Sequence, residues 1–277
     1  MRTLSRERDP SHPLADRVEF GRLQFEDRAE LVAALAGAHT LYNTYWVRFP
    51  RGTTTWDSVV ANTRTLLAAA REAGVRRVVQ VSVTNASAGS PLPYYRHKAI
   101  AEQAVRDSGL AYAIVRPTLV FAPGDILLNN IAWTLRRFPV FLIPGDGRYR
   151  VQPVAADDVA DVCVGAARAA DDAIECDAAG PVAYEYERLV RMIRAAVGAR
   201  SRLVHVPPGV AVAAGGVVGR LKRDALITER ELAGLMDEAL VSREPPRGTR
   251  SFENWLAAEA GALGRVYASE YARNWRR

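Results

Sequence analysis

The sequence contains little cysteine and little histidine, and it has no long hydrophobic run. Its two cysteines, Cys163 and Cys176, are too few for a disulfide framework, which favours a reducing compartment. The four histidines are scattered, and neither cysteine has a partner at metal-ligand spacing, so we expect no metal site. The nearest candidate for a membrane span, residues 210–219, is too short and too rich in glycine. Charged residues near the N-terminus interrupt any signal-peptide core, and we therefore predict a cytoplasmic protein.

The net charge of +6 is carried mostly by arginine. The basic residues are interspersed with Asp and Glu, and no nucleic-acid-binding motif accompanies the dense groups "RLKR" and "RNWRR". We therefore expect a solvated basic surface and no nucleic-acid partner. A weaker alternative is peripheral contact with a membrane through residues 210–223, where an apolar stretch has basic neighbours. The oligomeric state cannot be read from the sequence.

Short β-branched runs alternate with longer helical stretches, which predicts βαβ units and a parallel sheet. Strands are predicted over residues 2–6, 17–23, 39–46, 75–83 and 111–121. Helices are predicted over residues 27–37, 53–74, 93–109 and 157–170. From residue 122 the chain becomes irregular around one short helix, and the last third is expected to hold two more helices, a linker over 242–249 and a final helix.

The segment "PYYRHK" places Tyr94 and Lys98 four residues apart in a predicted helix. Positions i and i+4 lie on one helix face, so both side chains can enter the same cleft. An ammonium group close to a phenol favours the phenolate and lowers the phenol pKa. Such a tyrosine can donate a proton to a carbonyl oxygen while a hydride reaches the carbon. The pair alone is equally compatible with an exposed helix, on which we expect Tyr95 to pack and His97 to face solvent.

The strand before this helix ends in Ser82, Val83 and Thr84. Side chains alternate along a strand, so both hydroxyl groups are expected on one side. In open parallel sheets, ligands bind beyond the carboxyl ends of the strands, where these hydroxyls meet the start of the next helix. This context favours the interpretation of Tyr94 and Lys98 as a catalytic pair.

The stretch from "GVRRVVQVSVTN" to "YYRHKAIAEQAVRDSGLAYAIVRPTLVFAPGD" resembles the second half of an atypical or extended short-chain dehydrogenase/reductase. The shared features are a strand ending in Ser/Thr, a Tyr-x-x-x-Lys segment, a strand closing in Arg-Pro and the later segment "QPVAADDVADVCV". The resemblance covers roughly residues 2–180. Within the superfamily, the chain is most similar to the NmrA-like branch and to the dehydrogenase-type accessory subunit of respiratory complex I.

The resemblance implies roles for individual residues. Thr84 matches the catalytic Ser/Thr of the family, Tyr94 its acid and Lys98 its ribose-binding lysine. Pro117 and Thr118 match the segment that lies along the nicotinamide.

Ser82 and Tyr45 are further candidate cofactor contacts. Ser82 shares its side of the strand end with Thr84. Tyr45 belongs to an aromatic segment, together with Tyr42 and Trp46, that either lines the cofactor or substrate cleft or packs in the core.

The start of the chain departs from the family. The family opens with a strand and a Gly-x-x-Gly-x-x-Gly turn that holds the pyrophosphate, whereas residue 1 falls where the second strand begins. The absent strand would be central in a sheet of order 3-2-1-4-5-6, so a gap is expected in its place. The glycine-rich residues 213–220 follow "PPG" and are predicted to form a helix or loop. Two explanations stay open: upstream codons encode the strand and turn, or this chain binds dinucleotide poorly.

Ser5 and Arg6 occupy the position that selects between the two nicotinamide cofactors. A basic residue after the second strand accommodates the 2′-phosphate of NADP, whereas NAD enzymes place an acidic residue there. We therefore predict NADP, with NAD as the less favoured cofactor. The alternative is that Arg6 simply lies in a solvent-facing turn.

The sequence as a whole predicts an α/β protein with a Rossmann-like doubly wound parallel sheet and a small C-terminal cap. We expect a nucleotide-binding domain over residues 1–180 and a substrate or cap region over 181–277. The function implied by the resemblance is NAD(P)-dependent oxidoreduction or epimerisation of a small carbonyl or alcohol substrate. The alternative is a non-catalytic NAD(P)H-binding protein that senses redox state or stabilises a larger assembly.

Overall fold

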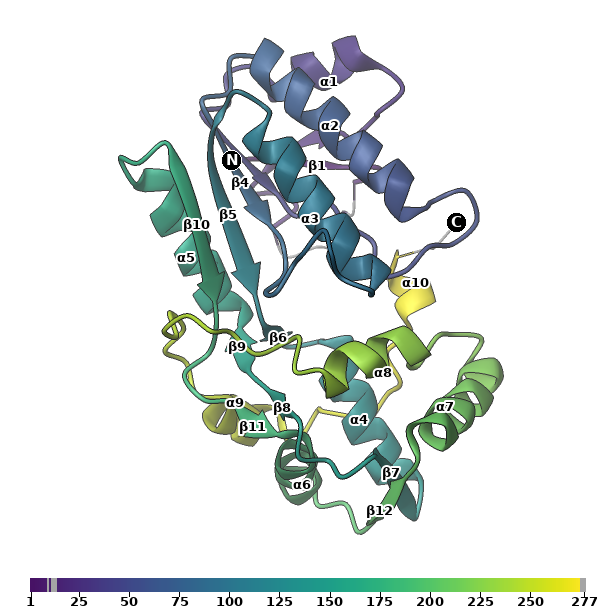
Figure 1. Cartoon of the computed structure of the whole chain (residues 1–277). Coiled ribbons are helices and arrows are strands. Elements are labelled where there is room, and N and C mark those ends of the chain that lie inside the picture. The colour runs from purple at the N-terminus through teal and green to yellow at the C-terminus, as the bar shows by residue number, and fades with distance from the viewer. Residues whose placement is uncertain (9, 11–13, 275–277) are drawn as a thin grey trace. The chain divides into compact units, whose positions relative to one another are not determined.

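The computed structural model describes residues 1–8, 10 and 14–274, and the chain forms two compact units (Figure 1). The first unit contains residues 1–82, 86–115 and 163–175. The second contains residues 83–85, 116–162 and 176–277, so it includes chain from both sides of residue 180.

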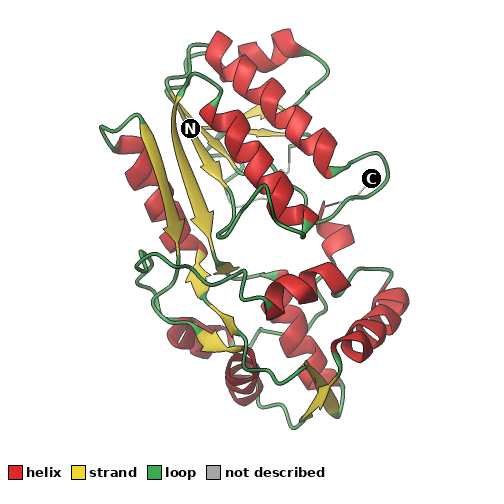
Figure 2. Ribbon diagram, viewed as in Figure 1, coloured by secondary structure: helices red, strands yellow, loops and turns green. Residues whose placement is uncertain are grey.

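The first unit is built from parallel strands and the helices that connect them (Figure 2). Its elements are β1 (Arg2–Ser5), β2 (Glu19–Arg22), α1 (Arg28–Leu35), β3 (Thr40–Asn43), α2 (Trp56–Glu72), β4 (Arg77–Val81) and α3 (Pro93–Arg106). The chain passes between the units within β5 (Ala111–Pro117), α5 (Ala156–Arg168) and β10 (Ala173–Ala178). Strand β4 pairs in parallel with β3 on one side and with β5 on the other. The predicted α/β class with a parallel sheet is confirmed.

The strands of the first unit belong to two separate sheets. β1 and β2 form a parallel pair, while β10, β5, β4 and β3 form a sheet in that order. No strand in the described part of the chain joins β1 to β3, which is the gap that the sequence predicts. Leu4 of β1 and Leu41 of β3 nevertheless pack against one apolar cluster, which includes Leu31 and Leu66. The two sheets therefore share one layer of helices.

The helices beside the candidate site lie within the predicted ranges, and α3 begins at the predicted residue. In α2, the hydroxyls of Thr55 and Ser58 each accept a hydrogen bond from the backbone of the other residue, which caps the orphan N–H groups. Gly74 ends this helix with a φ of +78°, a conformation that costs glycine little. Pro93 begins α3, where its missing N–H has no helical partner to lose.

The second unit contains short paired strands and six further helices among the described residues. The strands are β6 (Leu119–Phe121), β7 (Val140–Pro144), β8 (Arg150–Val151), β9 (Pro153–Ala155), β11 (Tyr184–Glu185) and β12 (Arg202–Val206). The helices are α4 (Ile126–Arg137), α6 (Tyr186–Ala196), α7 (Pro208–Lys222), α8 (Glu229–Met236), α9 (Phe252–Glu259) and α10 (Glu270–Asn274). β6 pairs with β9, β7 with β12 and β8 with β11. An apolar core that includes Leu128, Ile143, Tyr184, Leu189 and Phe252 holds these elements together.

The second unit is more regular than the sequence predicts. The single strand expected over 111–121 is interrupted at Thr118 and forms β5 and β6, which lie in different sheets. The irregular region after residue 121 contains three short strands besides α4, and the described part of the last third has five helices where two and a final one were expected. Two- and three-residue strands carry too few residues for an alternating pattern to be seen. No helix in the described part of the chain is long and apolar enough to cross a membrane.

Candidate functional site

Polar and aromatic side chains gather after the carboxyl ends of β3 and β4. Asn43, the last residue of β3, is buried, and its side-chain amide donates a hydrogen bond of 2.7 Å to Oε1 of Gln80. Its own Oδ1 accepts the backbone N–H of Tyr45 at 3.1 Å. This local bond turns the chain as it leaves the sheet, as Asx side chains commonly do. It thereby sets the path of the chain that carries Tyr45 and Trp46 after β3.

Tyr45 is held within the first unit by two contacts. Its hydroxyl accepts a hydrogen bond of 2.9 Å from the side-chain amide of Asn62 on α2. Its ring centre lies 4.9 Å from that of Phe25. The Tyr45 hydroxyl can still donate its proton, which leaves the predicted cofactor contact open as a prediction.

Tyr94 and Lys98 both contact the indole of Trp46. The Nζ atom of Lys98 lies 4.4 Å from the centre of the Trp46 ring, and the Tyr94 ring meets the same indole edge to face, with centres 6.2 Å apart. These geometries are typical of cation–π and aromatic contacts. One aromatic side chain therefore brings together the two members of the predicted catalytic pair.

The Lys98 amine is buried, with 4% of the residue exposed, and it donates a hydrogen bond of 3.2 Å to the carbonyl oxygen of Val81. Burial lowers the Lys98 pKa to about 7, and the negative charge of Glu102 offsets only part of this effect. The Glu102 carboxylate is already paired with Arg106 at 3.1 Å, and Arg106 also binds Glu175. Lys98 therefore changes its charge near neutral pH.

Among the described residues of the first unit, two buried polar atoms lack hydrogen-bond partners. They are the hydroxyl of Ser82, directly after β4, and the indole nitrogen of Trp46. Leaving such a group unpaired costs about 1–3 kcal/mol, so buried donors without partners often face a ligand. Both residues neighbour Lys98, whose amine donates to the carbonyl oxygen of Val81, directly before Ser82, and lies over the Trp46 ring.

His97 contradicts the expectation that it faces solvent. Its Nδ1 lies 2.7 Å from the carbonyl oxygen of Pro93, and its Nε2 lies 3.1 Å from Oδ1 of Asp57 on α2. Its ring centre is 5.6 Å from that of Trp56, and only 13% of the side chain is exposed. His97 thus connects the first turns of α2 and α3, whereas Tyr95 is buried as predicted.

The other predicted site residues of the first unit lie at the end of β1. The hydroxyl of Ser5 donates a hydrogen bond of 2.6 Å to the carbonyl oxygen of Glu7. Arg6 follows the strand directly and is exposed. This position at a carboxyl strand end is the one in which a basic residue can meet a nucleotide phosphate.

Thr84, Pro117 and Thr118 belong to the second unit. Thr84 is fully buried, and its hydroxyl donates a hydrogen bond of 2.7 Å to the carboxylate of Asp177. The same carboxylate oxygen accepts the hydroxyl of Ser242 at 2.6 Å. The backbone N–H of Thr84 donates to the carbonyl oxygen of Pro117, and the buried Thr118 hydroxyl has no partner. Sequence reasoning missed Asp177, because nothing in a single carboxylate within a strand distinguishes it.

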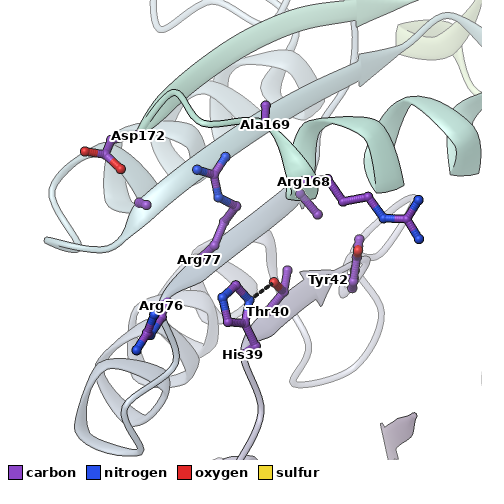
Figure 3. Close-up of a pocket in the computed structure, with 10 residues that line it drawn as sticks. His39, Thr40, Tyr42, Arg76, Arg77, Arg168, Ala169 and Asp172 are labelled. Atoms are coloured by element: carbon purple, nitrogen blue, oxygen red, sulfur yellow. Dashed lines mark hydrogen bonds between the residues drawn. The ribbon is translucent and has the colours of Figure 1, made fainter.

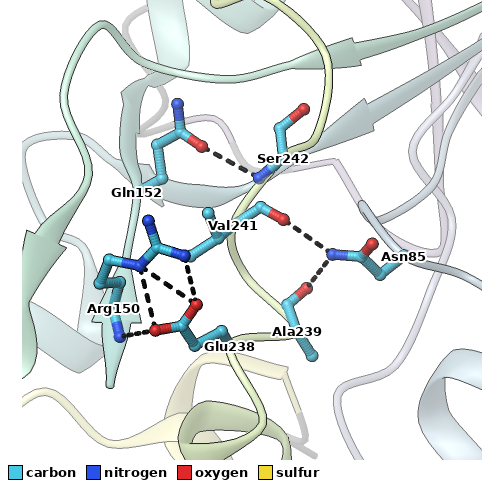
Figure 4. Close-up of polar contacts among 7 residues, drawn as sticks. All are labelled: Asn85, Arg150, Gln152, Glu238, Ala239, Val241 and Ser242. Carbon is cyan, nitrogen blue, oxygen red and sulfur yellow. Dashed lines mark hydrogen bonds and ion pairs between the residues drawn. The ribbon is translucent and has the colours of Figure 1, made fainter. Parts of the chain in front are cut away.

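A network that the sequence did not predict fixes the segment 238–242 (Figure 4). The side-chain amide of Asn85 donates to the carbonyl oxygens of Ala239 and Val241, at 3.1 and 2.8 Å. Arg150 binds both carboxylate oxygens of Glu238, and these residues border a cavity of about 450 Å³. Asn85 has a φ of +57°, a conformation in which asparagine is enriched. The asparagine after Ser-Val-Thr was therefore the one local sequence signal that could have indicated this turn.

A second cavity, of about 550 Å³, lies in the first unit at the amino-terminal ends of β3, β4 and β5 (Figure 3). Thr40, Arg77 and Ala111, the first residues of β3, β4 and β5, line it. Arg77 donates hydrogen bonds to the carbonyl oxygens of Ala166 and Asp171, at 2.9 and 2.7 Å. Because ligands of parallel sheets bind at the carboxyl ends, we assign Arg77 a structural role at the end of α5.

A parallel sheet covered by helices, with a buried lysine and unpaired donors beyond its carboxyl ends, defines a Rossmann-like nucleotide-binding protein. Comparison with known families gives the particular family. The family described as NAD(P)H-binding matches residues 1–170, and the chain belongs to this family.

Two curated relatives are mitochondrial proteins named NADH dehydrogenase [ubiquinone] 1 alpha subcomplex subunit 9. The Arabidopsis thaliana protein is 34% identical over 100 residues, which are 36% of this chain and 25% of the relative. The Mus musculus protein is 33% identical over 138 residues, which are 50% of this chain and 37% of the relative. The match therefore spans only 25% and 37% of the length of these relatives.

Solved structures share the fold over most of the chain. Triphenylmethane reductase from Citrobacter sp., complexed with NADP(H), has a TM-score of 0.72 at 16% identity and covers 94% of this chain and 90% of its own. The NADPH-dependent quinone oxidoreductase QOR2 from Escherichia coli has a TM-score of 0.72 at 19% identity, with 95% and 89% covered. At these identities the likeness shows the fold alone.

Proposed function

We propose that the protein is an NAD(P)H-dependent reductase or epimerase that acts on a small carbonyl or alcohol. The observation that carries the proposal is the pairing of Tyr94 with the buried Lys98 on one face of α3, against Trp46. A buried amine with a pKa near 7 is unusual on a structural helix, and perturbed groups of this kind concentrate at functional sites.

Each residue of the pair has a distinct task. Tyr94 donates a proton to the substrate oxygen during reduction and accepts it in the reverse direction. Lys98 in its protonated form stabilises the phenolate of Tyr94 and binds ribose hydroxyls. Trp46 holds both side chains in place and excludes water from one side of the amine. The bound cofactor supplies or takes up the hydride.

The described residues fit the nicotinamide riboside part of the cofactor. Ser82 and Trp46 provide buried donors without partners, and Lys98 provides a third donor. The described loops that follow β3 and β4 contain single glycines such as Gly52 and Gly89. The glycine-rich residues 213–219 lie within α7 and are therefore no phosphate-binding turn.

Arg6 favours NADP over NAD in this proposal. Its guanidinium follows the carboxyl end of β1, where it can form charge-assisted hydrogen bonds with a 2′-phosphate. The NADP(H) and NADPH complexes of the two structural neighbours agree with this preference.

The test combines cofactor binding with turnover in the 277-residue chain. NADPH binding is measured by fluorescence titration, and reduction is measured on a panel of carbonyl compounds. We expect Tyr94→Phe to keep cofactor affinity while turnover falls about 10²–10⁴-fold, the usual contribution of a positioned general acid. Tyr42→Phe is the matched control. It removes the hydroxyl of a tyrosine that is 45% exposed and borders the cavity at the amino-terminal ends of β3, β4 and β5. Equal turnover of Tyr94→Phe and the wild type would remove Tyr94 from the mechanism.

A second candidate function is non-catalytic NAD(P)H binding that senses redox state or stabilises an assembly. The hydrogen bond of Thr84 favours this function. The Thr84 hydroxyl donates its proton to Asp177 in the second unit, so this proton is not available to a substrate oxygen. The predicted role of Thr84 in orienting a substrate oxygen stays a prediction. NADPH binding without turnover on any compound of the panel would support this second function, and absence of NADPH binding would contradict both.

A further inference from the structure

Helix α7 carries an exposed apolar stripe, here called the outer face of α7 and formed by Val210, Ala213, Val217 and Leu221. The spacing of three and four residues places them on one side of the helix. Val210, Val217 and Leu221 are 48%, 55% and 79% exposed. No residue between Pro208 and Gly219 has a polar side chain. A helix that is apolar on all sides is normally buried, so the exposure of this one calls for a further apolar environment.

The inner face of α7 is closely packed and fixes the helix. A Cβ atom added to Gly215 would lie 2.9 Å from a side-chain carbon of Ile227, and one added to Gly219 would lie 2.7 Å from the carbonyl oxygen of Asp224. Both approaches are shorter than ordinary contacts, so glycine lets the helix approach the chain that follows it. The outer face is consequently presented outward by a helix anchored along its other side.

Basic side chains follow the stripe directly. Arg220, Lys222 and Arg223 are exposed at the C-terminal end of α7. The Nζ atom of Lys222 lies 4.9 Å from the centre of the Trp133 ring, which places the ammonium group beside an aromatic side chain.

The acidic residue next in the sequence does not neutralise this basic end. The carboxylate of Asp224 accepts the hydroxyl of Tyr267 at 2.9 Å and the backbone N–H groups of Glu270 and Tyr271. It is therefore occupied by internal hydrogen bonds, and the exposed Arg220 and Arg223 remain available to an anionic surface.

We propose that the outer face of α7 docks on the surface of an anionic lipid bilayer. Val217 and Leu221 would enter the boundary between head groups and acyl chains, while Arg220 and Arg223 meet lipid phosphates. A protein partner would be expected to meet aromatic and hydrogen-bonding groups, which the outer face lacks. A second copy that met this face with its own outer face of α7 would supply apolar surface, but it would bring a further set of cations rather than negative charge to the arginines. A bilayer satisfies both requirements.

Flotation of the 277-residue chain with vesicles tests the proposal. The vesicles contain phosphatidylcholine alone or phosphatidylcholine mixed with phosphatidylglycerol. We expect recovery with the anionic vesicles, weaker recovery with neutral ones, and a loss of at least tenfold in partitioning for the double variant Val217→Glu/Leu221→Glu. For Arg220→Gln/Arg223→Asn we expect a decrease of roughly 10- to 30-fold on anionic vesicles only, since each cation contributes about fivefold. Asparagine is chosen at position 223 because Arg223 has a φ of +52°.

Val182→Glu is the control for added negative charge, since it introduces a glutamate at another exposed valine, 41% exposed, between β10 and β11. Circular dichroism and thermal unfolding confirm that each variant is folded. Absence of wild-type flotation, or equal recovery of the wild type and Val217→Glu/Leu221→Glu, would overturn the proposal. Sedimentation velocity without vesicles supplies the remaining outcome: a dimer that this double variant dissociates would assign the outer face to self-association instead.

Discussion

The Lys98 amine lies over the Trp46 ring, 4.4 Å from its centre, and its hydrogen-bond acceptor is the carbonyl oxygen of Val81. Neither neighbour carries a full negative charge. The protein therefore holds an ammonium group in a site that compensates its lost hydration only partly, and this explains the direction of the pKa shift. An anionic or hydroxyl-rich ligand beside Lys98 would complete its coordination.

The lowered pKa makes folding stability depend on pH in a predictable direction. Between the folded pKa of about 7 and the ordinary value of 10.5, the unfolded chain binds the Lys98 proton and the folded chain does not. Stability therefore rises with pH in this window, by at most about 1.4 kcal/mol per pH unit. We expect wild-type stability in urea to gain about 2 kcal/mol more between pH 7 and pH 9 than the stability of Lys98→Met.

The other lysine of the chain provides the control for this measurement. Lys222→Met is the matched control, because it makes the same substitution at an exposed lysine on α7. Parallel curves for the wild type and Lys98→Met would show that burial does not perturb Lys98.

Much of the first unit could be predicted, because local signals agree with the tertiary arrangement there. Gly74 and Pro93 mark helix ends that the structure confirms. The i, i+4 spacing of Tyr94 and Lys98 correctly placed both on one face of α3. The separation of β1 from β3 also followed from the pattern, since each strand was recognised and their central neighbour was not.

The second unit could not be predicted to the same extent. Asp177 and Ser242 lie 65 residues apart and meet at one hydrogen bond, and no local pattern encodes such a pairing. The prediction for His97 was wrong because its ring binds Asp57 on another helix, 40 residues away. Long-range side-chain contacts of this kind decide burial independently of helix periodicity.

The hydroxyl of Thr84 can be tested by an isosteric substitution. Thr84→Val removes the donor to Asp177 and should lower the free energy of unfolding by about 1–3 kcal/mol, because a buried carboxylate loses a partner. If Thr84 also orients the substrate, turnover should fall more than tenfold in Thr84→Val and recover in Thr84→Ser. A valine variant with reduced stability and unchanged turnover would leave the hydroxyl a structural role only. Urea unfolding and carbonyl reduction provide the two readouts.

The segment 238–242 should depend on Asn85 for its protection from solvent. Asn85→Gly keeps the positive φ but removes the bonds to Ala239 and Val241, so amide exchange of the segment should accelerate about 5- to 30-fold. Asn85→Asp should accelerate it further, because a carboxylate would face two carbonyl oxygens. Hydrogen exchange of peptides spanning residues 238–244, read by mass spectrometry, makes the comparison. Unchanged exchange in both variants would mean that two other contacts suffice to hold the segment: Arg150 with Glu238, and Gln152, whose Oε1 accepts the backbone N–H of Ser242 at 3.0 Å.

The preference for NADPH over NADH should depend on Arg6. Arg6 follows β1 directly, and its guanidinium could form charge-assisted hydrogen bonds with a 2′-phosphate, a group that NADH lacks. We expect Arg6→Ala to weaken NADPH binding about tenfold, which corresponds to about 1.4 kcal/mol, and to leave NADH binding unchanged. Arg8→Ala is the matched control, because the Arg8 guanidinium donates to the carbonyl oxygen of Ala15 and pairs with Asp16. Fluorescence titration of each variant with both cofactors decides the question, and equal affinities of the wild type for NADPH and NADH would remove Arg6 from cofactor selection.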